Sequence, residues 1–211
     1  MRAKLDDAKL YGIVDAGYVQ PEAMEKACSE LLAGGAGVIQ LRAKGWSEQE
    51  VEQMAKSLLP LCREAGIPFV VNDFAQVAVN IGADGLHIGQ DDGSLAEARE
   101  VVGDAMIVGR STHSPEQARA ALAQGFDYLG FGPLFPTPTK KGRPGIGMEA
   151  VAEIQNDVGE QVPVFCIGGI TRANLDSVLE AGARRVVVVS DLLVSGSITS
   201  ATSEIVSKLE Q

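Results

Sequence analysis

The stretch AGGAGVIQL (33–41) contains the pattern that decides the fold: a helical segment ends at a glycine, and an apolar strand begins almost at once. Three more stretches repeat this pattern, namely NIGADGLHI (80–88), AQGFDYLGF (123–131) and EAGARRVVV (180–188). Gly35, Gly82, Gly125 and Gly182 occupy the same place in the four copies, where glycine tolerates the left-handed conformation that ends a helix. The recurrence predicts a strand–helix unit repeated along the chain.

The same alternation continues outside these four stretches. In several short runs both the odd and the even positions are apolar, as in strands buried on both faces. These runs predict strands over residues 10–14, 38–41, 69–71, 85–88, 106–108, 128–131, 164–167 and 186–189. Longer helical patterns predict helices over residues 21–32, 47–64, 74–80, 95–102, 114–123, 147–155, 172–179 and 198–209. Ser47 with Glu50, and Ser114 with Gln117, have the spacing of a capping box.

Eight such units in 211 residues fit an α/β fold, a single-domain (β/α)8 TIM barrel that spans residues 1–211. An open, doubly wound parallel sheet is the alternative. The dinucleotide-binding form of that sheet carries GxGxxG after its first strand, and the segment YGIVDAGYV (11–19) lacks this motif.

Composition narrows the kinds of binding partner and the cellular compartment that we expect for this protein. A net charge of −10 disfavours nucleic-acid and membrane-surface binding, and no window approaches the roughly 20 apolar residues of a membrane span. The first nine residues are polar and charged, so we expect no signal peptide. Cys28, Cys62 and Cys166 are odd in number and form no CxxC, which favours a cytoplasmic protein with buried thiols. The only two histidines, His87 and His113, cannot build a multi-histidine zinc site, and we expect His87 to be packed and hydrogen-bonded.

Polar residues follow the predicted strands at their carboxyl ends, where the active site of such a barrel lies. Arg42, Lys44 and Lys140 are cations that can bind phosphate oxygens. Asp73 and Asp92 end neighbouring strands, and two carboxylates with substrate phosphates commonly hold Mg²⁺. Capping of the following helices is the alternative role for these aspartates. Backbone N–H groups near Gly168, Gly169 and Ser190 could bind a phosphate, which is the usual place in barrels.

The segment 132–147 is long for a loop and contains four glycines, four prolines and three cations. Loops of this length are usually functional or disordered. We expect a lid that closes over an anion, with a plain connector as the alternative.

Seven motifs occur in a characteristic order: QLRAK (40–44), VVND (70–73), ADGLHIGQDD (83–92), GRSTHS (109–114), GPLFPTPTK (132–140), IGGI (167–170) and VVVS (187–190). With these spacings the chain resembles the thiamin phosphate synthase (thiamin-phosphate pyrophosphorylase) family over residues 10–193. The resemblance implies a Mg²⁺-dependent transferase of thiamin biosynthesis. Such an enzyme joins 4-amino-5-hydroxymethyl-2-methylpyrimidine diphosphate to 4-methyl-5-(β-hydroxyethyl)thiazole phosphate, and it releases thiamin phosphate and pyrophosphate.

The resemblance also assigns roles to residues by position. The pyrimidine's pyrophosphate is expected to be held by Gln40, Arg42, Lys44, Asn72 and Lys140, and one Mg²⁺ by Asp73 and Asp92. Ser111 matches a serine near the pyrimidine, and the expected catalytic residues are Arg42, Lys44, Lys140 and Ser111. The thiazole phosphate side is matched by Thr137, Thr139, Gly169, Val189 and Ser190. Many family members have a second aspartate where this chain has Phe74, but that aspartate is not the expected metal ligand.

Three other functions stay open at this stage. A thiazole tautomerase would keep the phosphate site at strands 7 and 8 without needing the pyrophosphate and metal residues. A sugar-phosphate isomerase or lyase would need a positioned acid–base pair, and a non-catalytic sensor would bind phosphorylated ligands without turnover. The sequence leaves open whether the protein is a homodimer and whether Mn²⁺ can replace Mg²⁺.

Overall fold

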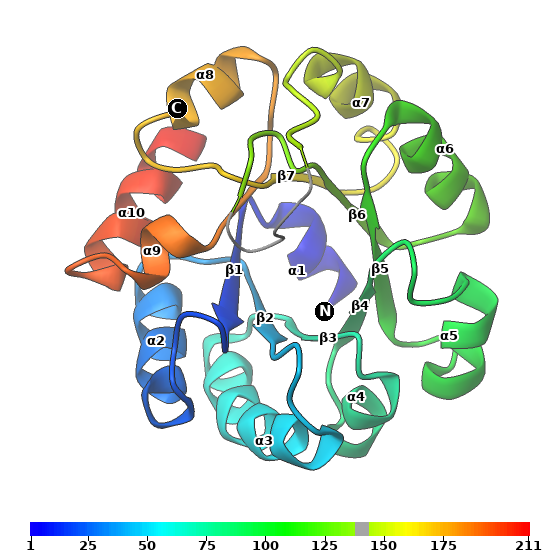
Figure 1. Ribbon diagram of the computed structural model, residues 1–211, viewed down its shortest axis with the longest axis vertical. Coiled ribbons are helices and arrows are strands. Elements are labelled where there is room, and N and C mark those ends of the chain that lie inside the picture. The colour runs from blue at the N-terminus through cyan, green and yellow to red at the C-terminus, as the bar shows by residue number, and fades with distance from the viewer. Residues whose placement is uncertain (138–143) are drawn as a thin grey trace.

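The computed structural model describes residues 1–137 and 144–211. Eight parallel strands form a closed barrel in which each strand pairs with the next along the chain and β8 pairs with β1. Figure 1 looks down this barrel, with the strands forming a central ring, the first helix seen within the ring and the other helices around it. The predicted (β/α)8 barrel is confirmed, and closure excludes the open doubly wound sheet.

The strands are β1 (Leu10–Asp15), β2 (Val38–Arg42), β3 (Phe69–Asn72), β4 (Gly85–Ile88), β5 (Ile107–Thr112), β6 (Tyr128–Phe131), β7 (Val164–Ile167) and β8 (Val186–Val188). The helices are α1 (Arg2–Asp7), α2 (Pro21–Ala33), α3 (Glu48–Ala65), α4 (Ala75–Ile81), α5 (Leu95–Val102), α6 (Pro115–Gln124), α7 (Val151–Asp157), α8 (Leu175–Glu180), α9 (Ser190–Leu193) and α10 (Ile198–Leu209).

The four repeated glycines have the backbone conformation that their position predicted. The φ angles of Gly35, Gly82, Gly125 and Gly182 are +97°, +68°, +92° and +101°. Each glycine therefore ends a helix and turns the chain directly into the next strand.

One of the two predicted capping boxes forms as expected. Ser47 and Glu50 cap α3 reciprocally through their side chains. Ser114 accepts a hydrogen bond from the Gln117 amide, but the Gln117 side chain accepts from the His113 N–H instead of from Ser114. The second reciprocal box was therefore wrong, because its return bond goes one residue further back.

Two helices were not predicted, and the ends of strands β5 and β8 differ from the prediction. Helix α1 packs Leu5 into the barrel interior, and one large apolar side chain in six residues gives no helical period. Strand β5 continues to Thr112, whereas hydrophobicity predicted its end at residue 108. Helix α9 begins at Ser190, immediately after a strand that ends at Val188 rather than 189.

The hydrophobic core has two layers. The larger layer lies between the outer faces of the strands and the surrounding helices. The smaller layer fills the barrel interior with Leu5, Ala8, Tyr11, Ile13, Val38, Val70, Ile107, Tyr128, Phe165 and Val187. Tyr11, Tyr128 and Phe165 pack together there, with ring centroids 5.2 to 6.1 Å apart.

Gly109 leaves the space that the Tyr128 ring occupies. A Cβ atom at Gly109 would lie 2.1 Å from Cζ of Tyr128, which no side chain can adopt without displacing the ring. At Gly130, on the neighbouring strand, an added Cβ would meet only ordinary contacts, the nearest being 3.8 Å from Cε1 of His87.

We therefore expect Gly109→Ala to lower the free energy of unfolding by about 1–3 kcal/mol through overpacking. The matched variant Gly130→Ala should change it by no more than about 1 kcal/mol, with stabilisation the expected sign because alanine reduces the freedom of the unfolded chain. Urea denaturation of both variants measures this difference. Equal losses in the two variants would contradict the role given to Gly109.

Candidate active site

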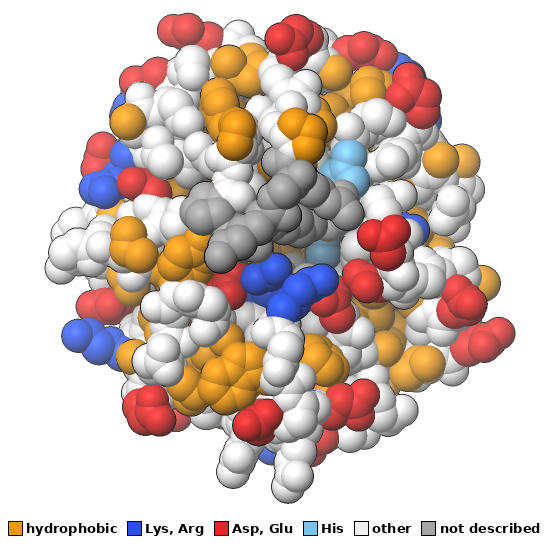
Figure 2. Space-filling model, viewed as in Figure 1, with side chains coloured by type: hydrophobic (Ala, Val, Ile, Leu, Met, Phe, Trp, Pro, Cys, Tyr) orange, Lys and Arg blue, Asp and Glu red, His pale blue; other side chains and the backbone are white. Residues whose placement is uncertain are grey.

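A cavity opens at the carboxyl ends of the strands, above the aromatic layer of the interior. Its lining includes eight residues expected from the sequence: Gln40, Arg42, Asn72, Ser111, Thr137, Gly169, Val189 and Ser190. In Figure 2, which looks at this face, Lys and Arg side chains gather near the centre with Asp and Glu on both sides. Thr139, Lys140 and the rest of 138–143, the middle of the expected lid, lie outside the described residues, so the lid stays a prediction.

Arg42 is held in place by a buried carboxylate. Its Nη1 atom lies 2.7 Å from Oδ2 of Asp15, at the carboxyl end of the neighbouring strand β1. The Asp15 side chain is 2% exposed and that of Arg42 13%, so the pair is largely removed from water. The other Asp15 oxygen accepts a hydrogen bond from the Gly17 N–H at 2.8 Å. Sequence reasoning missed Asp15, although a charged residue that ends a buried strand is the signal that identified the others.

Lys44, Asp73 and Asp92 form a charged cluster outside the lining of the cavity. The Lys44 Nζ atom lies 3.2 Å from Oδ2 of Asp73, and Asp92 is close enough to act on the Asp73 carboxyl. Burial raises the pKa of Asp73, the Lys44 ammonium opposes this rise, and the Asp92 carboxylate adds to it. The two carboxylates therefore lie together, with one cation beside them.

Neither aspartate caps a helix. The N-cap of α4 is Phe74, which makes no side-chain capping bond, and the N-cap of α5 is Ser94, in a reciprocal box with Glu97. Asp92 instead accepts a hydrogen bond from the Gly89 N–H at 2.8 Å. Asp73 also has a φ of +68°, an uncommon conformation for a residue other than glycine. The capping alternative was wrong for both residues.

The donor set of this cluster fits Mg²⁺ better than a metal held entirely by protein. Within residues 1–137 and 144–211, no group of three or more His, Cys, Asp or Glu side chains could hold a metal ion. Mg²⁺ typically takes one or two carboxylates and completes its shell with water and substrate phosphates. Asp73 and Asp92 supply two such carboxylates.

A chain of hydrogen bonds forms the polar floor of the cavity. Gln40 Nε2 donates to the Tyr11 hydroxyl at 2.9 Å, and the hydroxyls of Tyr11 and Tyr128 lie 2.9 Å apart. His87 bonds through Nδ1 to Tyr128 at 3.0 Å and through Nε2 to Ser111 Oγ at 2.9 Å. Burial raises the pKa of both tyrosines above the ordinary value, so both remain neutral phenols at neutral pH. The tyrosines were missed because they read as core residues.

The ends of β7 and β8 form a compact backbone corner. Gly168 and Gly169 have φ angles of +99° and +67°, and a Cβ at Gly168 would lie 2.3 Å from Cα of Pro133. Asn174 Nδ2 donates to the Gly169 carbonyl at 2.9 Å, which fixes the corner beside Ser190 in the cavity lining. This is the part of a barrel where backbone groups usually bind phosphate.

Comparison with known proteins identifies the family. The family described as thiamine monophosphate synthase matches residues 10–192. The chain belongs to this family. A thiamine-phosphate synthase of Thermus thermophilus is 50% identical over 162 residues, which cover 77% of each chain. A thiamine-phosphate synthase of Acidothermus cellulolyticus is 41% identical over 210 residues, which cover 99% of this chain and 98% of the relative.

A solved structure of this family agrees with the barrel. The thiamine phosphate pyrophosphorylase from Pyrococcus furiosus superimposes with a TM-score of 0.86 at 35% identity and covers 99% of this chain and 97% of its own. The family resemblance inferred from the motifs is therefore confirmed, and thiamin phosphate synthases are transferases. Among the described residues, no helix is both long and apolar enough to cross a membrane.

Removing Asp15 should be far more destabilising than removing a surface partner. We expect Asp15→Ala to lower the free energy of unfolding by about 3–5 kcal/mol, because it leaves Arg42 buried without a counter-charge. The control is Asp176→Ala, which breaks an exposed ion pair with Lys208 and should cost less than about 1 kcal/mol. Urea denaturation compares the two, and a similar small loss in both would show that the Asp15–Arg42 pair is not structurally important.

Replacing Asp73 by asparagine should stabilise the metal-free protein at neutral pH. Because its pKa is raised, the folded protein holds the carboxyl proton more tightly than the unfolded chain does. That stabilisation is present below the pKa of an unfolded aspartate and is lost as the pH rises through the raised pKa, so the ionised carboxylate destabilises the fold at neutral pH.

Asp73→Asn should therefore melt at a higher temperature than the unsubstituted protein at pH 7.5 in EDTA, and the difference should shrink as the pH falls towards 4. Asparagine also accepts the positive φ, whereas Asp73→Ala should melt below Asp73→Asn because alanine disfavours it. Thermal melts followed by circular dichroism measure all three proteins. A lower melting temperature for Asp73→Asn would contradict the burial argument.

Proposed function

We propose that this chain catalyses the Mg²⁺-dependent joining of 4-amino-5-hydroxymethyl-2-methylpyrimidine diphosphate to 4-methyl-5-(β-hydroxyethyl)thiazole phosphate, giving thiamin phosphate and pyrophosphate. The observation that carries the proposal is the meeting of anion-binding cations with a carboxylate pair at the mouth of one cavity in a chain of this family. The cavity floor is aromatic and polar, which suits a flat heterocycle.

In the proposed reaction, the C–O bond between the pyrimidine's methylene and the pyrophosphate breaks, and the pyrophosphate leaves with the electron pair. The lone pair of the thiazole nitrogen then forms the new C–N bond. The aminopyrimidine ring donates electrons to the methylene carbon, which favours a dissociative route. The protein's task is to stabilise the leaving charge and to align the nitrogen, so catalysis is electrostatic and positional.

Charged side chains at the mouth receive the pyrophosphate in this proposal. Arg42 offers a guanidinium held by Asp15, and Lys44 offers an ammonium beside Asp73. Asp73 and Asp92 would hold Mg²⁺, which when bound supplies positive charge to the leaving group. Gln40 and Asn72 line the cavity beneath these charges. The role of Lys140 rests on its position in the motif GPLFPTPTK alone.

In this proposal the thiazole phosphate binds against the corner formed by Gly169, Val189 and Ser190, with Thr137 also in the cavity lining. This assignment is supported by the positive φ of Gly169, which brings the backbone close to the cavity. Thr139 belongs to the same side on sequence grounds.

We also propose a reducing, cytoplasmic location, which is supported by three free and buried cysteines. The two thiols of Cys28 and Cys62 lie 4.0 Å apart without being joined. A homodimer and a domain spanning the whole of residues 1–211 stay predictions.

One assay separates this function from its alternatives. With both heterocycles and Mg²⁺, the protein should release thiamin phosphate and pyrophosphate in equal amounts, and EDTA should stop the reaction. A sensor would bind the ligands without releasing pyrophosphate, and a tautomerase would rearrange the thiazole alone; either result would overturn the proposal.

Substitution of a carboxylate should act on the metal dependence. Asp92→Asn should raise the Mg²⁺ concentration needed for half-maximal rate and lower turnover by about tenfold or more at limiting Mg²⁺. Asp176→Asn on α8 is the control for removing one negative charge and should behave like the unsubstituted protein. Unchanged Mg²⁺ dependence in Asp92→Asn would remove this residue from the metal site.

A further inference from the structure

The hydrogen-bond chain under the cavity has a direction, and that direction bears on the reaction. We propose that Gln40 sets the direction of this hydrogen-bond chain, so that His87 carries its proton on Nε2 and donates a hydrogen bond to Ser111. The hydroxyl proton of Ser111 then remains available for a hydrogen bond to the bound ligand. His87 is then a positioning residue that acts through Ser111. The donation from Ser111 to the ligand rests on the proposed function, because the ligand is the pyrimidine diphosphate. The proton positions in the free protein do not rest on the proposed function.

The direction starts at Gln40. Its buried amide Nε2 donates to the Tyr11 oxygen, and an amide nitrogen is only a donor. The remaining partner of the Tyr11 hydroxyl is Tyr128, at 2.9 Å. If Tyr128 donated to Tyr11, the single Tyr11 proton would have no acceptor in a fully buried position, which is unfavourable. Tyr11 therefore donates to Tyr128.

The same reasoning carries the direction to Ser111. Tyr128 accepts from Tyr11, and the Gln40 amide beside it acts as a further donor, so the Tyr128 proton goes to Nδ1 of His87. Nδ1 must then be an acceptor, and in a neutral imidazole the proton lies on Nε2. Nε2 is 2.9 Å from Ser111 Oγ and donates to it.

Ser111 is thereby turned towards the cavity. Its oxygen receives the His87 hydrogen bond, and its side chain is half-buried in the cavity lining. The hydroxyl proton is available to an acceptor atom on the ligand, a ring nitrogen or an ester oxygen of the pyrimidine diphosphate. The chain thus fixes Ser111 as a donor before the ligand arrives, which is preorganisation of the kind that favours catalysis.

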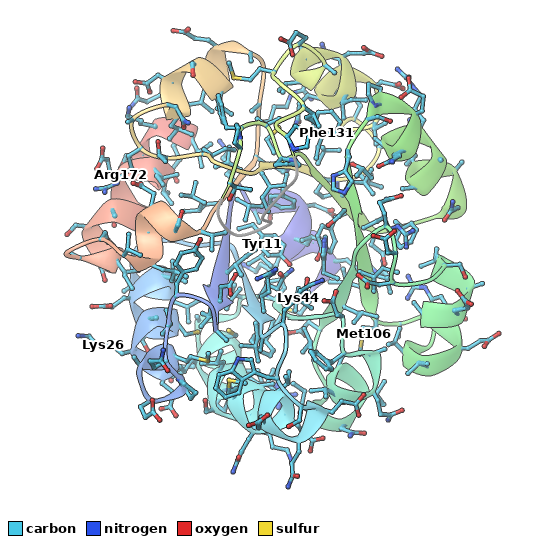
Figure 3. The ribbon with its side chains drawn as sticks, viewed as in Figure 1. Tyr11, Lys26, Lys44, Met106, Phe131 and Arg172 are labelled. Atoms are coloured by element: carbon cyan, nitrogen blue, oxygen red, sulfur yellow. The ribbon has the colours of Figure 1, made fainter. Side chains whose placement is uncertain are left out.

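His113 gives an internal contrast in the same cavity. Its Nδ1 atom bonds to the carbonyl oxygen of Gly132, which can only accept, so His113 carries a proton on Nδ1. His113 therefore carries a proton on the ring nitrogen, Nδ1, that is bare in His87. Figure 3 places Tyr11 inside the ring of strands, whereas Lys26 and Arg172 lie outside it among the helices.

Nitrogen NMR of the full-length protein, labelled with ¹⁵N-histidine and free of ligand, tests the proton positions directly. Two-bond ¹H–¹⁵N correlation distinguishes the two neutral tautomers, and His113→Asn leaves only the His87 signals. We expect protonated Nε2 and bare Nδ1 at His87. A proton on Nδ1, or on both nitrogens, would overturn the proposal whether or not the protein makes thiamin phosphate.

Replacing the donor at position 40 by an acceptor should reverse the direction of every hydrogen bond from residue 40 to His87. The carboxylate of Gln40→Glu can only accept a hydrogen bond, so Tyr11 should turn its proton to it and His87 should switch to the Nδ1–H tautomer. Thr112→Val removes a neighbouring buried hydroxyl, which bonds to the Gly130 carbonyl outside the chain, and should leave the His87 signals unchanged. An unchanged tautomer in a folded Gln40→Glu protein would show that Gln40 does not set the direction.

Kinetics tests the link to Ser111. Glutamine at position 87 can place a donor where Nε2 lies, and asparagine can reach only the Nδ1 side. We expect kcat to fall about tenfold further in His87→Asn than in His87→Gln, with KM for the thiazole phosphate little changed in both. Combined with Ser111→Ala, His87→Asn should add no further loss, since both changes remove the same hydrogen bond. Additive losses would overturn the action through Ser111, and absence of turnover in the unsubstituted protein would instead contradict the proposed function.

Discussion

The interior of an eight-stranded barrel must be filled by side chains, and in this protein two phenols fill its middle. Tyr11 and Tyr128 are nearly fully buried and pack against Phe165. The ring of Tyr128 requires Gly109 beside it, and the hydroxyls of both tyrosines require hydrogen-bond partners because a buried polar group without one is costly. Those partners are residues of the cavity above, among them Gln40. The packing of the core therefore sets the geometry of the site, and a change in either alters both.

The charges at the mouth are arranged in opposed pairs. The protein has a net charge of −10, yet its mouth collects cations, and each described cation of the proposed pyrophosphate site already faces a carboxylate. Arg42 faces Asp15, which is buried and fixed, whereas Lys44 faces Asp73, which belongs to the proposed metal pair. Binding of a metal with pyrophosphate would replace the Lys44–Asp73 contact by contacts of Lys44 to the pyrophosphate and of Asp73 to the metal. The Arg42–Asp15 contact would remain. The acidic surface thus sets the electrostatic field of the whole molecule, whereas a few local charge pairs determine the binding of a small anion.

The barrel was predictable because its strand–helix units repeat. An error in the bounds of one unit does not change the fold that the repeated units predict together. The eight strands and the family motifs could be found from hydrophobic runs and from short polar strings such as QLRAK (40–44). Asp15 and the hydrogen-bonded tyrosines could not, because their roles depend on partners from distant strands: Tyr11 and Tyr128 meet across 117 residues. The end of β5 was missed since its last residues, which include Ser111, are polar and paired through their backbone. Reasoning from local pattern thus finds the elements and misses the contacts between them.

The pairing of β8 with β1 has a consequence for the order in which the chain can reach this state. Leu10 pairs with Val186, so the ring of backbone hydrogen bonds stays open until β8 has left the ribosome. Until then β1 and β7 present unpaired edges, which other strands can bind. Helix α10 comes later still and bonds back to α2 from Thr199 to the Glu30 carbonyl. The nascent chain therefore keeps two open strand edges, which favour aggregation, until β8 closes the barrel.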